Sequence, residues 1–222
     1  MRPCRLFLFD LDGTLIDSRS DIAGSCNRAL ARLGLPAIPL DLVTRFVGEG
    51  VRTLITRALR EAAGREPPEE EVARAVALYL AEYEAHMLDS TRLYPGVVEA
   101  LNQMRWASFG VVTNKPERFS RIILERLGVG GRFSLIVGGD SLPQRKPDPA
   151  PIRVAMARAG ARAAETAVVG DSATDIEAGR AAGAFTCGIA GGFRGPEELR
   201  AAGCDLLVES VADLPLHFQP PA

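Results

Sequence analysis

The chain has 222 residues, of which 47% are hydrophobic and 24% are charged, and its formal net charge is −2. These values are typical of a globular protein with a sizeable core, and the charge gives no electrostatic basis for binding nucleic acid or an anionic membrane. The four cysteines form no CxxC pair and the two histidines stand far apart, so neither a zinc site nor a disulfide framework is expected. No segment approaches the roughly 18 apolar residues of a membrane span, and the expected compartment is the cytoplasm.

The first 88 residues combine one strand pattern with a purely helical block. Residues 5–10 form an apolar run that ends in Asp10 and predicts a buried strand. Between residues 18 and 88 apolar side chains recur with the 3.6-residue period of a helix. The period is clearest over residues 22–33, 51–59 and 72–87.

From about residue 91, short apolar β-branched runs alternate with helical patterns. The predicted strands are 109–113, 134–139, 166–171, 185–190 and 205–210, and the predicted helices are 96–106, 116–128, 149–160 and 174–183. Alternating strands and helices indicate a parallel sheet with helices on both faces, and the isolated first strand is its missing partner. We therefore expect an α/β fold, a doubly wound parallel sheet formed by residues 1–17 and 89–222. Residues 18–88 are expected to be an inserted all-helical cap domain.

Polar residues follow the first four predicted strands, at the sheet edge where open α/β sheets bind ligands. They are Asp10, Asp12, Thr113, Asn114, Lys146, Asp171 and Asp175. Several carboxylates in one place repel each other, and a hard divalent cation such as Mg²⁺ relieves that repulsion. A lysine and a hydroxyl beside them suit a phosphoryl group. With no histidine or cysteine at this edge, the expected nucleophile is a carboxylate and the expected intermediate an aspartyl-phosphate.

The same polar residues stand in four motifs, DLDGT, VVTNK, RKPDP and GDSATD, which occur in this order across the chain. They resemble the four motifs of the haloacid dehalogenase superfamily. Within it, LYPGVVEAL, VVTNKPERF, GGDSLPQRKPDPAP and the helical block with FVGEGV resemble the phosphoglycolate phosphatases. The resemblance implies a Rossmann-like core with a helical cap, and a Mg²⁺-dependent phosphatase acting on a small phosphorylated metabolite, first of all 2-phosphoglycolate.

The resemblance also implies a role for each motif residue. Asp10 would attack phosphorus, while Asp12 would protonate the leaving oxygen and later deprotonate the hydrolytic water. The residues implied in phosphate binding are Thr113, Asn114 and Lys146, and those implied in metal binding are Asp10, Asp12 and Asp171. Asp175 would be a supporting carboxylate, although a helix N-cap explains it as well. Lys115, Arg145 and Asp148 are weaker candidates.

Substrate choice is expected to depend on the helical block, because the core recognises little beyond the phosphoryl group. Gly48, Glu49 and Gly50 form a glycine-bracketed turn that Arg45 and Arg52 flank. An arginine there would suit a carboxylate-bearing substrate, and the alternative is a helix–helix turn with solvated arginines.

Several other functions fit the same core motifs. They are a pyrophosphatase or sugar-phosphate phosphatase, a phosphotransferase similar to β-phosphoglucomutase, and a phosphoryl-binding module without catalysis. The last would not need both Asp10 and Asp12.

Overall fold

The computed structural model describes residues 1–221, and residue 222, the last of the expected core range, lies outside the described residues. The chain divides into two compact units. The core unit consists of Met1–Asp17 and Leu93–Ala222, and the helical unit of Ser18–Arg92.

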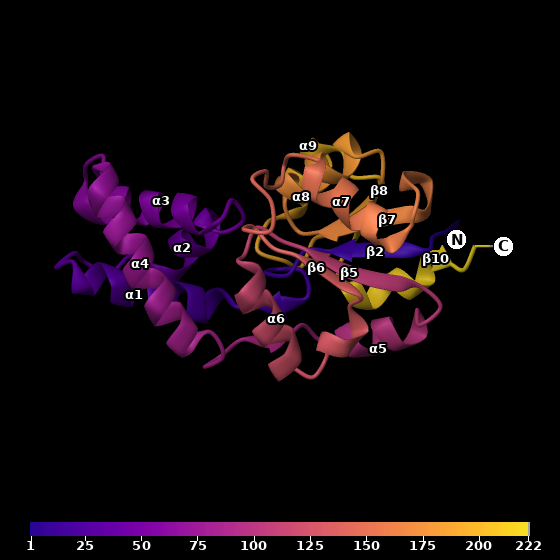
Figure 1. Ribbon diagram of the computed structural model, residues 1–222, viewed down its shortest axis with the longest axis horizontal. Helices are drawn as coiled ribbons and strands as arrows, with labels where there is room; N and C mark the ends of the chain where they lie inside the picture. Colours follow the sequence, from indigo (N-terminus) through magenta and orange to yellow (C-terminus); the bar gives the residue numbers. More distant parts are fainter. Residues whose placement is uncertain (222) are drawn as a thin grey trace. The chain divides into compact units, whose positions relative to one another are not determined.

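A six-stranded sheet forms the centre of the core unit (Figure 1), with the strand order β6-β5-β2-β7-β8-β9. The strands are β2 (Leu6–Phe9), β5 (Ser108–Val112), β6 (Leu135–Val137), β7 (Thr166–Gly170), β8 (Phe185–Ile189) and β9 (Leu206–Val208). Each neighbouring pair is parallel, so the expected doubly wound α/β fold is confirmed. β2 lies between β5 and β7 in the interior of the sheet, which places the residues that follow it among the ends of three strands.

Helices cover both faces of this sheet (Figure 1). The helices of the core unit are α5 (Val97–Gln103), α6 (Glu117–Arg126), α7 (Ala150–Ala159), α8 (Ala173–Ala181) and α9 (Pro196–Ala202). Three short 3₁₀ helices are η1 (Gly130–Arg132), η2 (Ala163–Glu165) and η3 (Val211–Leu216). Two short strand pairs complete the assignment, β1 (Arg2–Pro3) with β10 (Phe218–Gln219) and β3 (Ile16–Asp17) with β4 (Arg92–Leu93).

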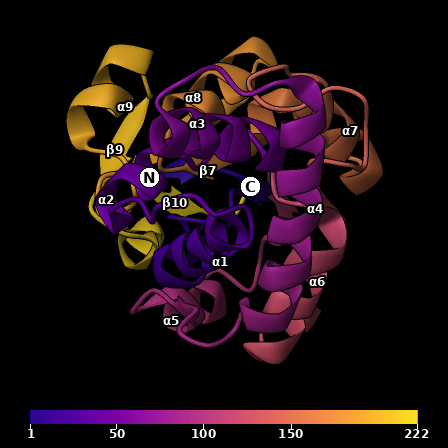
Figure 2. The same ribbon diagram turned by 90° about the vertical axis from the view of Figure 1, so that its left-hand side faces the viewer.

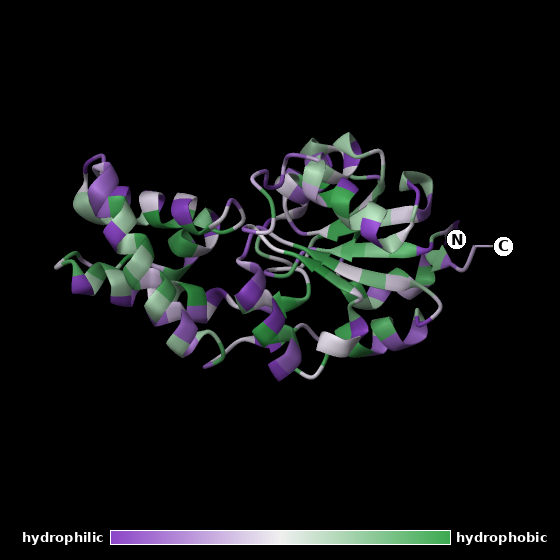
Figure 3. Ribbon diagram, in the orientation of Figure 1, coloured by the Kyte–Doolittle hydropathy of each residue, from purple (hydrophilic) through white to green (hydrophobic). Residues whose placement is uncertain are grey.

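The sequence of β2 explains why it is buried on both sides. Side chains alternate between the faces of a strand. Leu6 and Leu8 join an aliphatic cluster that includes Ile152 of α7. Phe7 belongs to an aromatic cluster on the other face and meets the ring of Phe218 at a centroid distance of 4.9 Å. Figure 3 colours the strands mostly green, which marks hydrophobic residues, as expected for a sheet that lies between two layers of helices.

The helical unit consists of α1 (Arg19–Arg32), α2 (Leu40–Phe46), α3 (Val51–Ala63) and α4 (Glu69–His86), which Figure 2 shows in indigo to magenta. α3 ends at Gly64 in the left-handed conformation, a common helix C-cap. α4 begins after Pro68 with three glutamates in its first turn, where negative charge favours the helix dipole. The short helix α2 was not among the predicted helices. Within residues 1–221, the structure contains no helix with the length and apolar character needed to cross a membrane.

Candidate active site

Asp10 is held at the carboxyl end of β2. Its backbone N–H donates to the carbonyl oxygen of Val169 at 2.8 Å, which extends the pairing of β2 with β7. The chain then turns at Gly13, whose φ of 89° is a conformation that favours glycine. The turn closes through a hydrogen bond from the N–H of Gly13 to the carbonyl of Ile16.

Three carboxylates meet at this sheet edge. Asp10, Asp171 and Asp175 each offer an oxygen, and these oxygens lie within 4.8 Å of one another. Asp171 and Asp175 are 3% and 1% exposed, and the side chain of Asp10 is 13% exposed. We name these three residues the acidic cluster. Hard, all-oxygen ligands in such a group fit a divalent cation.

Lys146 contacts two members of the acidic cluster. Its Nζ lies 2.9 Å from Oδ1 of Asp10 and 2.5 Å from Oδ1 of Asp175. Burial lowers the pKa of Lys146, but the two carboxylates outweigh it and raise the pKa above its ordinary value. The acidic cluster thus has three carboxyl groups, and the ammonium of Lys146 contacts two of them.

The surplus of acids affects the pKa of two members of the acidic cluster. Burial, followed by the charges of Asp175 and Asp10, raises the pKa of Asp171 well above its ordinary value. Burial also raises the pKa of Asp10, where the charge of Lys146 opposes it and that of Asp175 adds to it. A bound cation would favour the ionised form of both groups.

Two glycines leave space for Asp171. A Cβ atom on Gly13 would lie 2.3 Å from Oδ2 of Asp171, and one on Gly192 would lie 2.3 Å from its Cβ. The carboxylate accepts hydrogen bonds from the backbone N–H of Phe193 at 2.7 Å and from the hydroxyl of Thr14 at 3.3 Å. The backbone at Gly13 and at Gly192 thus leaves room for the carboxylate of Asp171.

Asp175 stands at position N3 of α8 and not at the N-cap, which is Ser172. It lies in the first turn of α8, and its Oδ2 accepts hydrogen bonds from the N–H and the hydroxyl of Ser172 as part of a capping box. Its other oxygen contacts Lys146. One carboxylate therefore completes the capping box and belongs to the acidic cluster.

Asn114 positions Lys146. Its side-chain amide donates to the carbonyl oxygen of Lys146 at 2.8 Å and accepts from the N–H of Lys146 at 3.0 Å. The side chain of Asn114, which was expected to bind phosphate, thus binds the main chain of Lys146. Thr113 is buried at the end of β5, and its Oγ1 accepts a hydrogen bond from the N–H of Lys115 at 3.3 Å.

The side chain of Asp12 is not a member of the acidic cluster. Both of its oxygens accept hydrogen bonds from Nζ of Lys115, at 2.8 Å and 2.9 Å. The side chains of Asp12 and Lys115 are only 9% and 6% exposed. The structure thus brings Asp10, Asp171 and Asp175 together and pairs Asp12 with a second lysine.

Comparisons with known proteins show the family of the chain. Residues 7–189 match the model of the haloacid dehalogenase-like hydrolases. The chain belongs to this family. It is 39% identical over 220 residues, 98% of this chain and 94% of the relative, to a plasmid-encoded protein of Cupriavidus necator named phosphoglycolate phosphatase.

Two further comparisons support the family assignment. A protein of Pseudomonas putida, also named phosphoglycolate phosphatase, is 38% identical over 95% of this chain and 78% of its own length. The crystal structure of a predicted phosphoglycolate phosphatase from Haemophilus somnus has a TM-score of 0.90 and 34% identity, covering 96% of this chain and 97% of that one. The expected class, a phosphoric monoester hydrolase of this family, is confirmed.

Four residues expected to govern substrate choice lie in the helical unit of the hydrolase. Gly48, with φ of 120°, lies in the turn between α2 and α3, and Arg45 is exposed near the end of α2. Glu49 forms an ion pair with Arg57 at 2.8 Å, and Arg52 pairs with Glu69.

Two weaker candidates have structural contacts in the core unit. Arg145 donates a hydrogen bond to the carbonyl oxygen of Gly139. Asp148 accepts one from the N–H of Ala150, at the start of α7.

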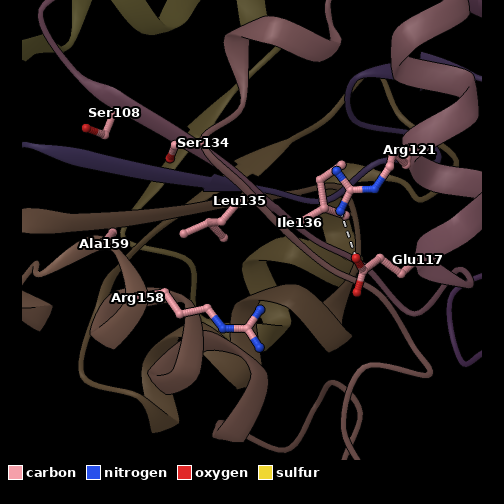
Figure 4. Close-up of a pocket in the computed structure, with 8 residues that line it drawn as sticks. All are labelled: Ser108, Glu117, Arg121, Ser134, Leu135, Ile136, Arg158 and Ala159. Carbon is pink, nitrogen blue, oxygen red and sulfur yellow. Dashed lines mark hydrogen bonds and ion pairs between the residues drawn. The ribbon is translucent and has the colours of Figure 1, made fainter.

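The hydrolase also has a surface pocket of about 470 Å³ beside the edge strand β6 (Figure 4). Its lining residues are Ser108, Glu117, Arg121, Ser134, Leu135, Ile136, Arg158 and Ala159. Glu117 and Arg121 form an ion pair across one side of it. No residue of the acidic cluster lines this pocket, so it is separate from the candidate active site.

Sequence reasoning missed three contacts of the hydrolase's site. They are the hydroxyl of Thr14 on Asp171, the N–H of Phe193 on Asp171, and Lys115 on Asp12. The glycine pair before Phe193 was a usable signal, because adjacent glycines after a strand indicate a close backbone approach. The partner of Lys115 lies 103 positions away, and no local pattern indicates it.

Proposed function

We propose that this hydrolase is a Mg²⁺-dependent phosphatase that uses Asp10 as its nucleophile. The observation that carries the proposal is the contact of buried Lys146 with Asp10 inside the acidic cluster. A carboxylate placed between an ammonium and two further acids suits attack on a phosphoryl group, whose negative charge the ammonium offsets.

The reaction proceeds in two steps. A carboxylate oxygen of Asp10 bonds to phosphorus as the bond to the ester oxygen breaks, and Asp12 gives its proton to that oxygen. Water then attacks the phosphorus of the aspartyl-phosphate, Asp12 accepts the proton, and release of phosphate restores Asp10. Thr113 donates a hydrogen bond to a phosphoryl oxygen, and Lys146 offsets the charge of the group in both steps.

The acidic cluster would hold the metal. When bound, Mg²⁺ supplies positive charge that lets ionised carboxylates and a phosphoryl group approach each other. Asp10 and Asp171 would be its direct ligands, and Asp175 would support the site while it fixes the start of α8. The glycines at positions 13 and 192 support this assignment, because they give the carboxylate of Asp171 its space.

The proposed substrate is 2-phosphoglycolate, and the proposed compartment is the cytoplasm. The names of the relatives from Cupriavidus necator and Pseudomonas putida favour this ester. Its carboxylate needs a cation, and the core has already committed its lysines to Asp10 and Asp12. We therefore assign its recognition to Arg45 and Arg52 of the helical unit, with Gly48 and Glu49 shaping the turn between them.

A panel of phosphate esters tests the proposal. Phosphate release is measured with Mg²⁺ for 2-phosphoglycolate, glucose 1-phosphate, pyrophosphate and glycerol phosphate. We expect the highest kcat/KM for 2-phosphoglycolate. The Arg45→Ala and Arg52→Ala variants should raise KM for this ester more than for glycerol phosphate, and Arg74→Ala, at an exposed site on α4, is the matched control. A higher kcat/KM for another ester would overturn the substrate, and no release from any ester would overturn the phosphatase.

A further inference from the structure

The chain contains only two lysines. Of its 26 Lys and Arg residues, 24 are arginines, and the lysines are Lys115 and Lys146. Both are buried, at 8% and 4% exposure, and each pairs with an aspartate of the DLDGT motif. Lys146 has a role in the proposed reaction, whereas Lys115 does not yet have one.

Stability alone does not explain the pair of Lys115 and Asp12. Removing two charges from water costs free energy that their attraction often fails to recover, so a buried ion pair is weak evidence for stabilisation. This pair is well formed, because one ammonium donates to both carboxylate oxygens at 2.8 Å and 2.9 Å. Such a contact fixes the orientation of the carboxyl group, which a single hydrogen bond does not.

The backbone places Lys115 beside the phosphate-binding residue of the same motif. Thr113 directly follows β5, and the N–H of Lys115 donates to its Oγ1 at 3.3 Å. The residues after β5 therefore supply both the hydroxyl that the proposed reaction assigns to the phosphoryl group and the ammonium that contacts Asp12. Asp10, the proposed nucleophile, and Asp12, the proposed acid, thus contact different lysines.

We infer that Lys115 is a positioning residue for Asp12. When one oxygen of Asp12 carries the proton for the leaving oxygen, Nζ of Lys115 donates to the other oxygen and holds the carboxyl group in place. The inference rests on the proposed function. Proton transfer requires the acid to lie within hydrogen-bond reach of the leaving oxygen, and a well-placed acid contributes about 10²–10⁴ in rate. The contribution is large for an alkoxide leaving group and small for 4-nitrophenolate, which departs without a proton.

The test compares leaving groups in Lys115→Met and Lys115→Arg. The value of kcat/KM covers the steps up to the first departure of the leaving group, so it isolates the step in which Asp12 acts as an acid. In Lys115→Met we expect kcat/KM to fall at least about tenfold more for glycerol phosphate than for 4-nitrophenyl phosphate. Lys115→Arg should recover most of the loss, since a guanidinium can also donate to both oxygens. Arg121→Met, which removes an exposed cation on α6, is the control and should behave as wild type.

Three results would overturn the inference. An equal loss for both esters would make Lys115 a structural residue, and wild-type kinetics would remove it from the reaction. A loss confined to 2-phosphoglycolate, seen as a higher KM, would make Lys115 a contact for the substrate carboxylate. Lys115→Gln gives the same comparison if melting curves show that the methionine variant is unfolded. A wild-type enzyme that hydrolyses no ester refutes the proposed function itself, which is distinct from these results.

Discussion

Lys146 is the residue on which the charge balance of the site depends most directly. Its ammonium contacts Asp10 and Asp175, and both of its main-chain groups are held by Asn114. The lysine is therefore fixed at both ends, which is the arrangement expected of a group that stabilises charge without moving. Preorganisation of this kind is the main source of electrostatic catalysis.

We predict that Lys146→Ala lowers kcat by about 10²–10³, the scale for the loss of one electrostatic stabiliser of a transition state. The measurement is steady-state phosphate release at saturating Mg²⁺. Arg153→Ala, at an exposed position on α7, is the control for loss of a cation. Kinetics of Lys146→Ala equal to those of the control would show that Lys146 has only a structural role.

The residue scale also shows where sequence reasoning succeeds. Asp10, Asp171, Asp175 and Lys146 could be grouped from the sequence, because they follow strands whose carboxyl ends share one edge of a parallel sheet. The pairing of Asp12 with Lys115 could not, because both residues follow strands at the same edge and their order there does not determine which ammonium meets which carboxylate.

The loop between β8 and α9 forms one wall around Asp171. Gly192 allows the loop to approach, since a Cβ atom there would lie 2.5 Å from the carbonyl oxygen of Gly13 as well as close to Asp171. Phe193, the next residue, donates its N–H to Oδ2 of Asp171. The loop thus belongs to the proposed metal site although it contributes no acid.

We expect Gly192→Ala to displace Asp171 and to weaken Mg²⁺ binding by about tenfold or more, since disturbing an outer partner of a metal ligand typically costs 10–100-fold. Calorimetric titration with Mg²⁺ measures this without relying on turnover. Gly131→Ala is the matched control, because a Cβ atom there meets open space. Equal affinities of the two variants would exclude the loop from the metal site.

A buried carboxylate, that of Asp21, links the two ends of the helical unit. Asp21, near the start of α1, accepts hydrogen bonds from the N–H groups of Ser90 and Thr91 and from the hydroxyl of Thr91. Burial raises the pKa of Asp21, but these hydrogen bonds outweigh it, so its pKa is lowered. The ionised form is therefore part of the fold.

We predict that Asp21→Ala lowers the free energy of unfolding by about 1–3 kcal/mol, because the buried N–H and hydroxyl of Thr91 and the N–H of Ser90 lose their acceptor. Because the folded pKa is depressed, the contribution of Asp21 is present above its unfolded value and is lost as pH falls through the folded value. Urea unfolding across that range measures it, and Asp21→Asn, which keeps one acceptor oxygen, should lie in between. A constant difference between wild type and Asp21→Ala at every pH would contradict the account.

Element prediction from the sequence missed two of the short helices, α2 and α9, although it found the equally short α5. The helices α1, α3 and α4 show a long apolar period, and each was predicted. The seven-residue helices α2 and α9 each bury one residue, Val43 and Leu199. One buried residue defines no period, so neither helix could be recognised in this way.

At the scale of the whole molecule, the acidic cluster links folding, protons and metal. The pKa values of Asp10 and Asp171 are raised above their ordinary value. Between the unfolded value of about 4 and the raised values, the folded state binds more protons than the unfolded state. The stability contributed by these groups therefore falls as pH rises through this window.

We predict that Mg²⁺ raises Tm more at neutral pH than near pH 5, because protons compete with the metal for the carboxylates. Scanning calorimetry with and without Mg²⁺ measures the difference. Metal-free Asp171→Asn should melt above metal-free wild type at neutral pH and gain little from Mg²⁺. A Mg²⁺ effect that is the same at both pH values would mean that these carboxylates do not bind the metal.

The α/β architecture of the molecule was predictable because the strands of a parallel sheet are buried on both faces and appear as continuous apolar runs, as in residues 6–9. The substrate was not predictable in the same way. The core motifs recognise a phosphoryl group, which many esters share. Two of the residues of the helical unit that were expected to select among these esters already form ion pairs, Arg52 with Glu69 and Glu49 with Arg57.

The central claim is that Asp10 carries the phosphoryl group during the reaction, and chemical trapping tests it most directly. Enzyme turning over a phosphate ester with Mg²⁺ is quenched in acid and reduced with tritiated borohydride, which releases the phosphate and converts an aspartyl-phosphate to labelled homoserine. The labelled residue is then mapped by mass spectrometry. We predict homoserine at position 10, in amounts that depend on Mg²⁺, and no label or turnover in Asp10→Asn. Label on another residue would contradict the account. So would turnover by Asp10→Asn above about a tenth of wild type, because even the loss of one stabilising group lowers the rate by more than that.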